Sequence, residues 1–200
     1  NGYRHLELYY AISGIGAVCH TINPRLSSDQ LTYIINHAED LLLFVDLTFV
    51  PILEAVKEKL PPEIKIIILT DKKNMPKTSL KTICYEELLK DKPQKINWPD
   101  FNEDTAASLC YTSGTTGEPK GTLYSHRSTV LHAMMIAISL PDALKEGKKI
   151  LPVVPLFHVN AWGLPYAAPL TGAGIVFPGP KLDGDSLFNL MEAEKVYSAW

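Results

Sequence analysis

The chain has 200 residues, of which 46% are hydrophobic and 20% are charged. This is the composition of a globular domain, and it excludes a disordered chain, a collagen and a coiled coil. The net charge is −3 and no part of the chain is strongly basic, so we expect no nucleic-acid partner. No apolar run approaches the roughly 18 residues that a membrane-spanning helix requires.

The cysteines indicate a reducing compartment. Cys19, Cys84 and Cys110 are odd in number and far apart in the sequence. This spacing argues against a disulfide framework and against a zinc cluster. We therefore expect reduced thiols and a cytoplasmic location.

The first half of the chain predicts alternating helices and strands. A helix-like spacing over 4–12 ends near two glycines, and either Ser27 or Ser28 can cap a second helix whose apolar positions recur at i, i+3, i+4 and i+7. Continuous apolar runs are typical of strands covered on both faces. In this half the expected strands are 16–22, 41–45 and 63–70, and a third helix covers 49–60.

The second half continues the same alternation after a polar, lysine-rich stretch over 72–104 that holds a short helix at 85–89. The expected strands are 106–111, 150–154 and 174–177, and the expected helices are 125–140 and 183–193. Met134 and Met135, on the first of these helices, are expected in the core. Strands that alternate with helices predict an α/β fold with a layered, mostly parallel sheet and flanking helices.

The segment YTSGTTGEPKG, residues 111–121, carries the clearest chemical signal. It follows an expected strand and precedes an expected helix, at the edge where α/β sheets bind ligands. Its hydroxyls and glycine-flanked amides suit anionic oxygens, and Lys120 adds a mobile cation. Pro119 and Gly121 stand where a Walker A loop needs Gly and Ser or Thr, so this is not that motif. A plain surface turn is the alternative interpretation.

The same segment resembles the phosphate loop of the adenylate-forming (AMP-binding) superfamily, and TLYSHR at 122–127 resembles its usual continuation. Two further blocks are similar to the long- and medium-chain fatty acyl-CoA synthetase branch. They are GAVCHTINPRL at 16–26 and VPLFHVNAWG at 154–163. The resemblance spans nearly the whole chain. It implies that residues 1–200 are part of the large N-terminal adenylation domain of such an enzyme.

The resemblance implies a ligase that uses ATP and Mg²⁺ to convert a fatty acid into an acyl-adenylate and pyrophosphate, then transfers the acyl group to CoA with release of AMP. It assigns three catalytic residues, His158, Lys120 and Thr112, and makes Thr112 the magnesium ligand. Val159 and Trp162 would line the acyl side, with Trp162 as a wall of the tunnel. The residues expected to wrap the phosphates are Thr112, Ser113, Gly114, Thr115, Thr116, Gly117 and Lys120.

The adenine and ribose motifs of the superfamily, and its C-terminal lid with the assisting lysine, do not occur in this sequence. We therefore expect the chain to be an excerpt of a longer protein, inactive by itself, with some apolar faces exposed. A homodimer of the complete protein and contact with a membrane surface are left open.

Several functional alternatives remain at this point. The acid could be short-chain, aromatic or sulfur-containing instead of a fatty acid. The loop could serve a noncatalytic module that senses a nucleotide, or a conventional P-loop ATPase. Acid-dependent exchange of pyrophosphate into ATP separates the ligase from the last two.

Overall fold

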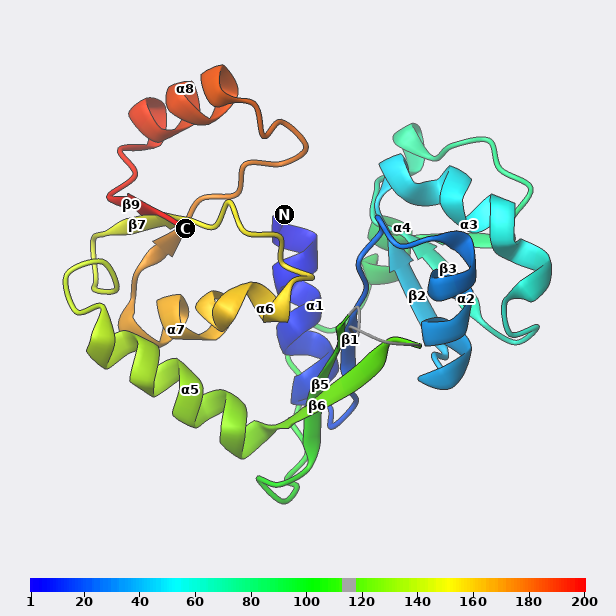
Figure 1. The fold of residues 1–200 in the computed structure, drawn as a ribbon, viewed down its shortest axis with the longest axis horizontal. Helices are drawn as coiled ribbons and strands as arrows, with labels where there is room; N and C mark the ends of the chain where they lie inside the picture. The colour runs from blue at the N-terminus through cyan, green and yellow to red at the C-terminus, as the bar shows by residue number, and fades with distance from the viewer. Residues whose placement is uncertain (113–117) are drawn as a thin grey trace. The chain divides into compact units, whose positions relative to one another are not determined.

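The computed structural model describes residues 1–112 and 118–200. These residues form helices and small sheets with strand orders β1-β5-β6, β2-β3-β4 and β8-β7-β9 (Figure 1). The strands are β1 Cys19–Thr21, β2 Leu42–Val45, β3 Lys65–Ile68, β4 Thr82–Cys84, β5 Ala106–Thr112, β6 Lys120–Ser125, β7 Lys149–Leu151, β8 Gly174–Ile175 and β9 Ser198–Ala199. The α-helices are α1 Tyr3–Gly14, α2 Ser28–His37, α3 Val50–Val56, α4 Tyr85–Leu89, α5 His126–Ser139, α6 Val159–Trp162, α7 Leu164–Thr171 and α8 Gly184–Glu194. Short 3₁₀ turns lie at Leu47–Phe49, Lys57–Lys59 and Lys72–Asn74.

The predicted mixed α/β class with mostly parallel strands is confirmed. The pairs β1–β5, β2–β3, β3–β4, β7–β8 and β7–β9 are all parallel. The expected strands are distributed over separate small sheets. The chain divides into two compact units, one made of 1–21, 98–110 and 121–200 and the other of 22–97 and 111–120.

The unit formed by 22–97 and 111–120 is built around the sheet β2-β3-β4. Ser27, not Ser28, caps α2: its Oγ accepts from the amide of Gln30 at 3.3 Å, and the Gln30 side chain accepts in turn from the amide of Ser27. Such a reciprocal cap fixes where the helix begins. One face of α2 and α3 packs on the sheet, as Figure 1 shows. Contrary to expectation, β2 is not covered on both faces, because Leu42 is 49% exposed.

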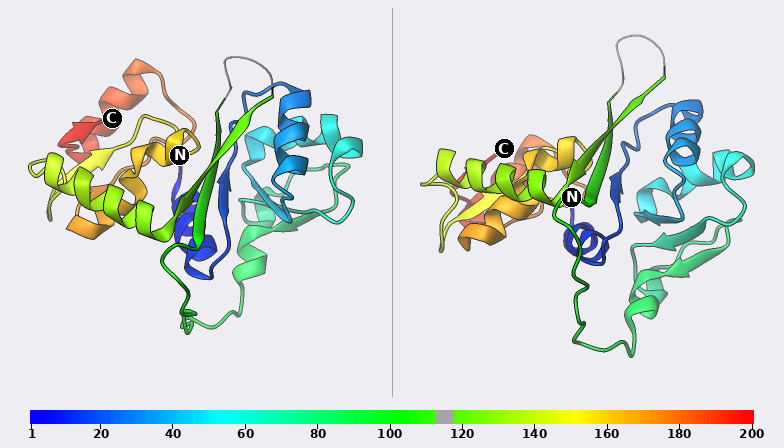
Figure 2. Two further views of the ribbon diagram at one scale, coloured as in Figure 1. Left: turned by 60° about the horizontal axis from the view of Figure 1, so that its bottom comes forward. Right: turned by 90° about the horizontal axis from the view of Figure 1, so that it is seen from below.

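The other unit holds α1, the sheets β1-β5-β6 and β8-β7-β9, and helices α5 to α8. The side chain of Ser125 caps α5 by accepting from the amide of Ser128 at 3.1 Å. Buried Leu164, Ala167 and Ala168 of α7 share a core cluster with Ala133 of α5 and Ile150 of β7. Figure 2 shows β5 and β6 running side by side.

Two expectations for this unit are wrong. Residues 120–125 form the exposed strand β6 between the loop and α5, whereas we expected the loop to lead directly into the helix. An edge strand that is exposed on both faces has no alternating apolar pattern to reveal it. Met134 and Met135 are 45% and 60% exposed, not in the core. Helix α5 is apolar around most of its surface, so its sequence does not indicate which face is buried.

Candidate functional site

A left-handed turn follows the VPLFH segment and is the most unusual backbone feature of the described residues. Val159, Asn160, Ala161 and Trp162, the residues of α6, have φ angles of 48°, 51°, 46° and 53°, and Gly163 follows at 75°. A left-handed helical conformation costs roughly 1–2 kcal/mol for each residue that carries a Cβ. Strain of this size persists only where surrounding contacts enforce it, which occurs mainly at functional sites.

Gly163 closes the turn for a steric reason as well as a conformational one. A Cβ built on Gly163 would lie 2.7 Å from Cδ2 of His132. The same imidazole has its Nε2 3.2 Å from the carbonyl oxygen of Trp162, so α5 supports the end of the turn. His132 of α5 thus contacts the backbone of the turn.

A buried polar network holds the turn from the other side. Asn160 is 8% exposed, and its Nδ2 donates to Oγ of Ser108 at 2.9 Å. Its Oδ1 lies 3.1 Å from the thiol of Cys110, 3.2 Å from the hydroxyl of Thr21 and 3.3 Å from that of Tyr9. Both ends of the Asn160 amide are therefore satisfied by side chains from α1, β1 and β5.

The parallel pairing of β1 with β5 brings these groups together. Thr21 is the register partner of Cys110, and Ser108 precedes Cys110 by two residues, on the same face of the strand. Tyr9 of α1 also donates its hydroxyl to the carbonyl of Leu156, and Thr21 lies 3.2 Å from the carbonyl of Phe157. The network thus contacts the chain immediately before the turn as well as the turn itself.

Burial keeps the donors of this network protonated. Loss of solvent raises the pKa of Tyr9 well above its usual value, and it also raises the pKa of the Cys110 thiol, although the hydrogen bond with Thr21 opposes that rise. A neutral phenol and a neutral thiol each keep a proton to donate. A thiol or phenol that keeps its proton is a weak nucleophile, so the network serves to hold structure.

The turn presents three of the predicted site residues to solvent. His158 is exposed, Val159 is 42% exposed and Trp162 is 48% exposed. Between them, Asn160 and Ala161 point into the protein and are buried. The turn directly follows the exposed imidazole of His158 and itself carries an exposed indole, so both rings belong to one short surface element.

The predicted phosphate loop has only its flanks among the described residues. Thr112 ends β5 and Lys120 begins β6; both side chains are exposed, and the Thr112 hydroxyl lies 3.5 Å from the carbonyl oxygen of Lys120. Tyr111 is fixed by His37, whose Nδ1 is 2.6 Å from the Tyr111 hydroxyl. The predicted binding residues Ser113, Gly114, Thr115, Thr116 and Gly117 lie outside the described residues.

The predicted site residues divide between the two compact units. His158, Val159 and Trp162 share the turn in one unit, while Thr112 and Lys120 belong to the other. Sequence reasoning missed Tyr9, Thr21, Ser108 and Asn160. Of these residues, Asn160 alone combines two features that the sequence could have shown. Asparagine is enriched at left-handed backbone positions, and this one lies inside the motif block at 154–163.

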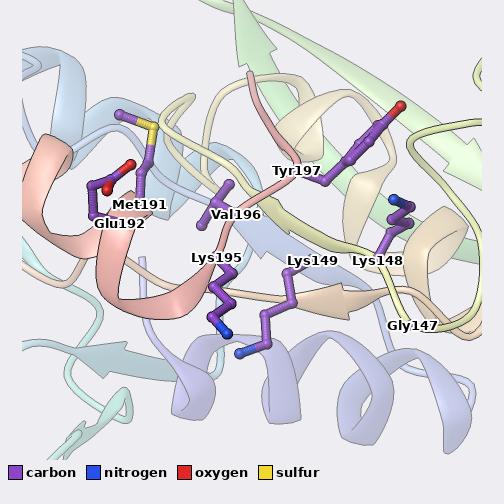
Figure 3. Close-up of a pocket in the computed structure, with 8 residues that line it drawn as sticks. All are labelled: Gly147, Lys148, Lys149, Met191, Glu192, Lys195, Val196 and Tyr197. Atoms are coloured by element: carbon purple, nitrogen blue, oxygen red, sulfur yellow. The ribbon is translucent and has the colours of Figure 1, made fainter.

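Two hollows lie in the unit that carries the turn. One has a volume of about 310 Å³ and is mainly apolar; Tyr166 lines it and also packs edge-on against Tyr9 and Tyr10. Its other lining residues include Ala107, His126 and Val130. The second, of about 490 Å³, is a surface hollow lined by Lys148, Lys149 and Lys195 (Figure 3). Lys148 lies over the ring of Tyr197, and Lys149 pairs with Glu194 outside the lining. Of the predicted site residues that the structure describes, none lines either hollow.

Comparison with known proteins fits this architecture. The profile of the family described as AMP-binding enzyme matches residues 1–199. The chain is 53% identical over 200 residues to a medium-chain-fatty-acid–CoA ligase of Ectopseudomonas oleovorans, covering 98% of this chain and 36% of that protein. It is 50% identical over 202 residues to a 3-methylmercaptopropionyl-CoA ligase of Ruegeria lacuscaerulensis, covering 96% and 36%. The chain thus spans about a third of the length of these curated relatives.

Solved structures agree on the fold. A long-chain-fatty-acid–CoA ligase of Archaeoglobus fulgidus superposes with a TM-score of 0.83 at 23% identity, covering 100% of this chain and 38% of that one. Fold and site together define the class of protein. It is an α/β protein in which parallel strands lie beside a strained, left-handed turn that follows a histidine. The chain belongs to the AMP-binding enzyme family.

Proposed function

We propose that the whole protein is an AMP-forming ligase that couples a fatty acid to CoA. A carboxylate oxygen attacks the α-phosphorus of ATP, and the bond to the departing pyrophosphate breaks. The CoA thiol then loses its proton, forms a bond to the acyl carbon and displaces AMP. The observation that carries the proposal is the rigid turn that exposes His158 and Trp162 together in a chain of this family.

The residues of the chain divide these tasks. His158 would orient the carboxylate and stabilise charge as the adenylate forms, while Val159 and Trp162 form a wall for the acyl chain. Lys120 and the hydroxyls of the loop would neutralise the departing pyrophosphate. In this scheme the adenine and ribose contacts and the lid with its assisting lysine belong to other parts of the enzyme, and residues 1–200 are part of its N-terminal domain.

Magnesium fits the residues that flank the loop. Among the residues that the structure describes, no group of three or more His, Cys, Asp or Glu is arranged to hold a metal ion. Mg²⁺ at a nucleotide does not need one, because phosphate oxygens and water supply most of its ligands. The exposed hydroxyl of Thr112 is a suitable hard oxygen ligand. When bound, the ion would withdraw charge from the phosphate oxygens.

No helix among the described residues is long and apolar enough to cross a membrane. Cys19, Cys84 and Cys110 are free and buried, which favours a reducing, cytoplasmic compartment.

Exchange of labelled pyrophosphate into ATP by the full-length protein tests the proposal. We expect exchange to depend on an added acid and on Mg²⁺, with fatty acids preferred in a panel that includes short-chain, aromatic and sulfur-containing acids. ATP hydrolysis without an acid, or nucleotide binding without exchange, would contradict a ligase.

A sulfur-containing acid is the second candidate substrate. The chain is nearly as similar to the 3-methylmercaptopropionyl-CoA ligase as to the fatty-acid ligase, at 50% against 53% identity. Both acids have an apolar tail, and a tail of either kind can lie against an indole wall. A higher kcat/KM for the methylthio acid than for any fatty acid in the panel would select this alternative.

Trp162→Ala is expected to change which acyl length is preferred, with little change in the KM for ATP. Each buried methylene contributes about 0.8 kcal/mol of binding free energy. Removal of an apolar wall therefore changes the binding free energy contributed by every acyl carbon that the wall contacts. We expect the ratio of kcat/KM between long- and short-chain acids to change by about tenfold, as measured with a series of saturated acids. Equal loss at every chain length would contradict a role as the tunnel wall.

A further inference from the structure

We propose that Asn160 is a positioning residue, which fixes the backbone of the turn and thereby sets the place of His158 and Trp162 toward the acid. This inference rests on the proposed function, because it assumes that the turn faces the acyl substrate. Asn160 itself is buried and points away from solvent, so it acts through its neighbours.

The first argument is the direction of its contacts. The Nδ2 and Oδ1 atoms of Asn160 contact Ser108, Cys110, Thr21 and Tyr9, which belong to three different elements. A side chain bonded to a helix and two strands cannot follow small movements of a loop. The amide therefore links the turn to buried side chains of α1, β1 and β5.

The second argument is that the strain and the network coincide. Asn160 stands second among four consecutive non-glycine residues with positive φ, and the amides of Ala161 and Gly163 donate to the carbonyls of His158 and Asn160 at 2.9 and 3.0 Å. The contact of His132 with the Trp162 carbonyl supports only the end of the turn, so loss of the buried contacts of Asn160 would remove the side-chain support from its middle. The backbone would then relax and move both flanking side chains.

The third argument is the polarity of the surroundings. The side-chain amide of Asn160 has one donor group and one acceptor. Burial keeps the neighbouring Tyr9 and Cys110 protonated, so the oxygen of the amide must face these donors and its orientation is determined. An apolar residue at this position would leave the Ser108 hydroxyl and the Cys110 thiol without this partner. The hydrogen-bonded arrangement around the native Asn160 therefore specifies one conformation of the turn.

The test compares Asn160→Gly and Asn160→Ala in the full-length enzyme. Glycine tolerates the left-handed backbone but lacks the amide, whereas alanine lacks the amide and also resists positive φ. For Asn160→Gly we expect a loss of about 100-fold in kcat/KM for the acid, the effect of misplacing reacting groups by about 1 Å, with the KM for ATP nearly unchanged. Asn160→Ala should lose at least as much.

Hydrogen exchange supplies a readout that does not depend on activity. The amides of Ala161 and Gly163 should exchange at least tenfold faster in Asn160→Gly, while amides of β5 keep their rates. Should the alanine and glycine variants fail to fold, Ser108→Ala removes only the acceptor of Nδ2 and is expected to give the same pattern more weakly.

The outcomes are distinct. If the amide hydrogens of Ala161 and Gly163 exchange at the same rate in Asn160→Gly as in the unmodified enzyme, the proposal is overturned. It is also overturned if these amides exchange faster while kcat/KM for the acid is unchanged. If the unmodified enzyme shows no acid-dependent pyrophosphate exchange, the proposed function fails, while the amide exchange still reports whether Asn160 holds the turn.

Discussion

His158→Ala is expected to slow formation of the acyl-adenylate by about 10²–10³-fold, the range observed when one preorganised donor at a developing charge is removed. The imidazole is exposed, and the turn that follows it is held by buried side chains, so the backbone that carries the ring is in place before the substrate binds. Its backbone amide and carbonyl are also fixed, by Pro155 and Ala161. Loss of the ring should therefore act on the rate and leave the fold intact.

The measurement is acid-dependent pyrophosphate exchange with saturating ATP, with the midpoint of thermal unfolding as the control for folding. Two conservative variants identify the nitrogen that matters. His158→Asn places an amide nitrogen near the position of Nδ1, and His158→Gln places one near Nε2. We expect one of the two to recover at least tenfold over alanine. Exchange at the unmodified rate in His158→Ala would remove this residue from the reaction.

The sequence allowed the fold to be predicted where burial leaves a periodic signal. The apolar run at 63–70 contains β3, whose Ile66, Ile67 and Ile68 are buried. The helix at 85–89 matches α4, and Asp183 caps α8 as the expected start at 183 implies. In each case the local pattern and the final burial agree, so local reasoning is sufficient.

Local reasoning failed where partners come from distant parts of the chain. Tyr9 and Thr21 are ordinary residues in their own segments, and they meet Asn160 only through tertiary contacts with separations of 151 and 139 residues. The left-handed backbone at 159–162 is likewise invisible to propensity, because valine and tryptophan disfavour it. The turn was predicted as part of a motif, but its shape depends on contacts more than a hundred residues away in sequence.

Strand β5 contacts the turn and ends beside the segment that the sequence predicts as a phosphate loop. Ser108 and Cys110 contact Asn160, and β5 continues to Thr112, the last described residue before the loop. Tyr111 between them is held by His37 and packs on the core of β2 and β3.

Lys120→Ala, the second substitution with a large expected effect, addresses that loop. A charge-assisted hydrogen bond to a phosphate is worth about 1.5–3 kcal/mol, so its loss should raise the KM for ATP or lower the exchange rate by about 10- to 100-fold. Lys120 is exposed at the first position of β6, where its removal leaves no cavity. Stability should therefore change by less than about 0.5 kcal/mol.

Lys72→Ala is the matched control, because Lys72 is also an exposed lysine but lies in a 3₁₀ turn of the polar stretch. We expect its kinetics to equal those of the unmodified enzyme. Lys120→Arg keeps the charge, so it should recover part of the loss if the lysine acts on phosphate as a cation. Equal ATP affinity and exchange rate in Lys120→Ala and Lys72→Ala would instead identify residues 111–121 as an ordinary surface turn. In the proposed reaction this lysine stabilises the departing pyrophosphate, so the defect should be the same with every acid, unlike that of Trp162→Ala.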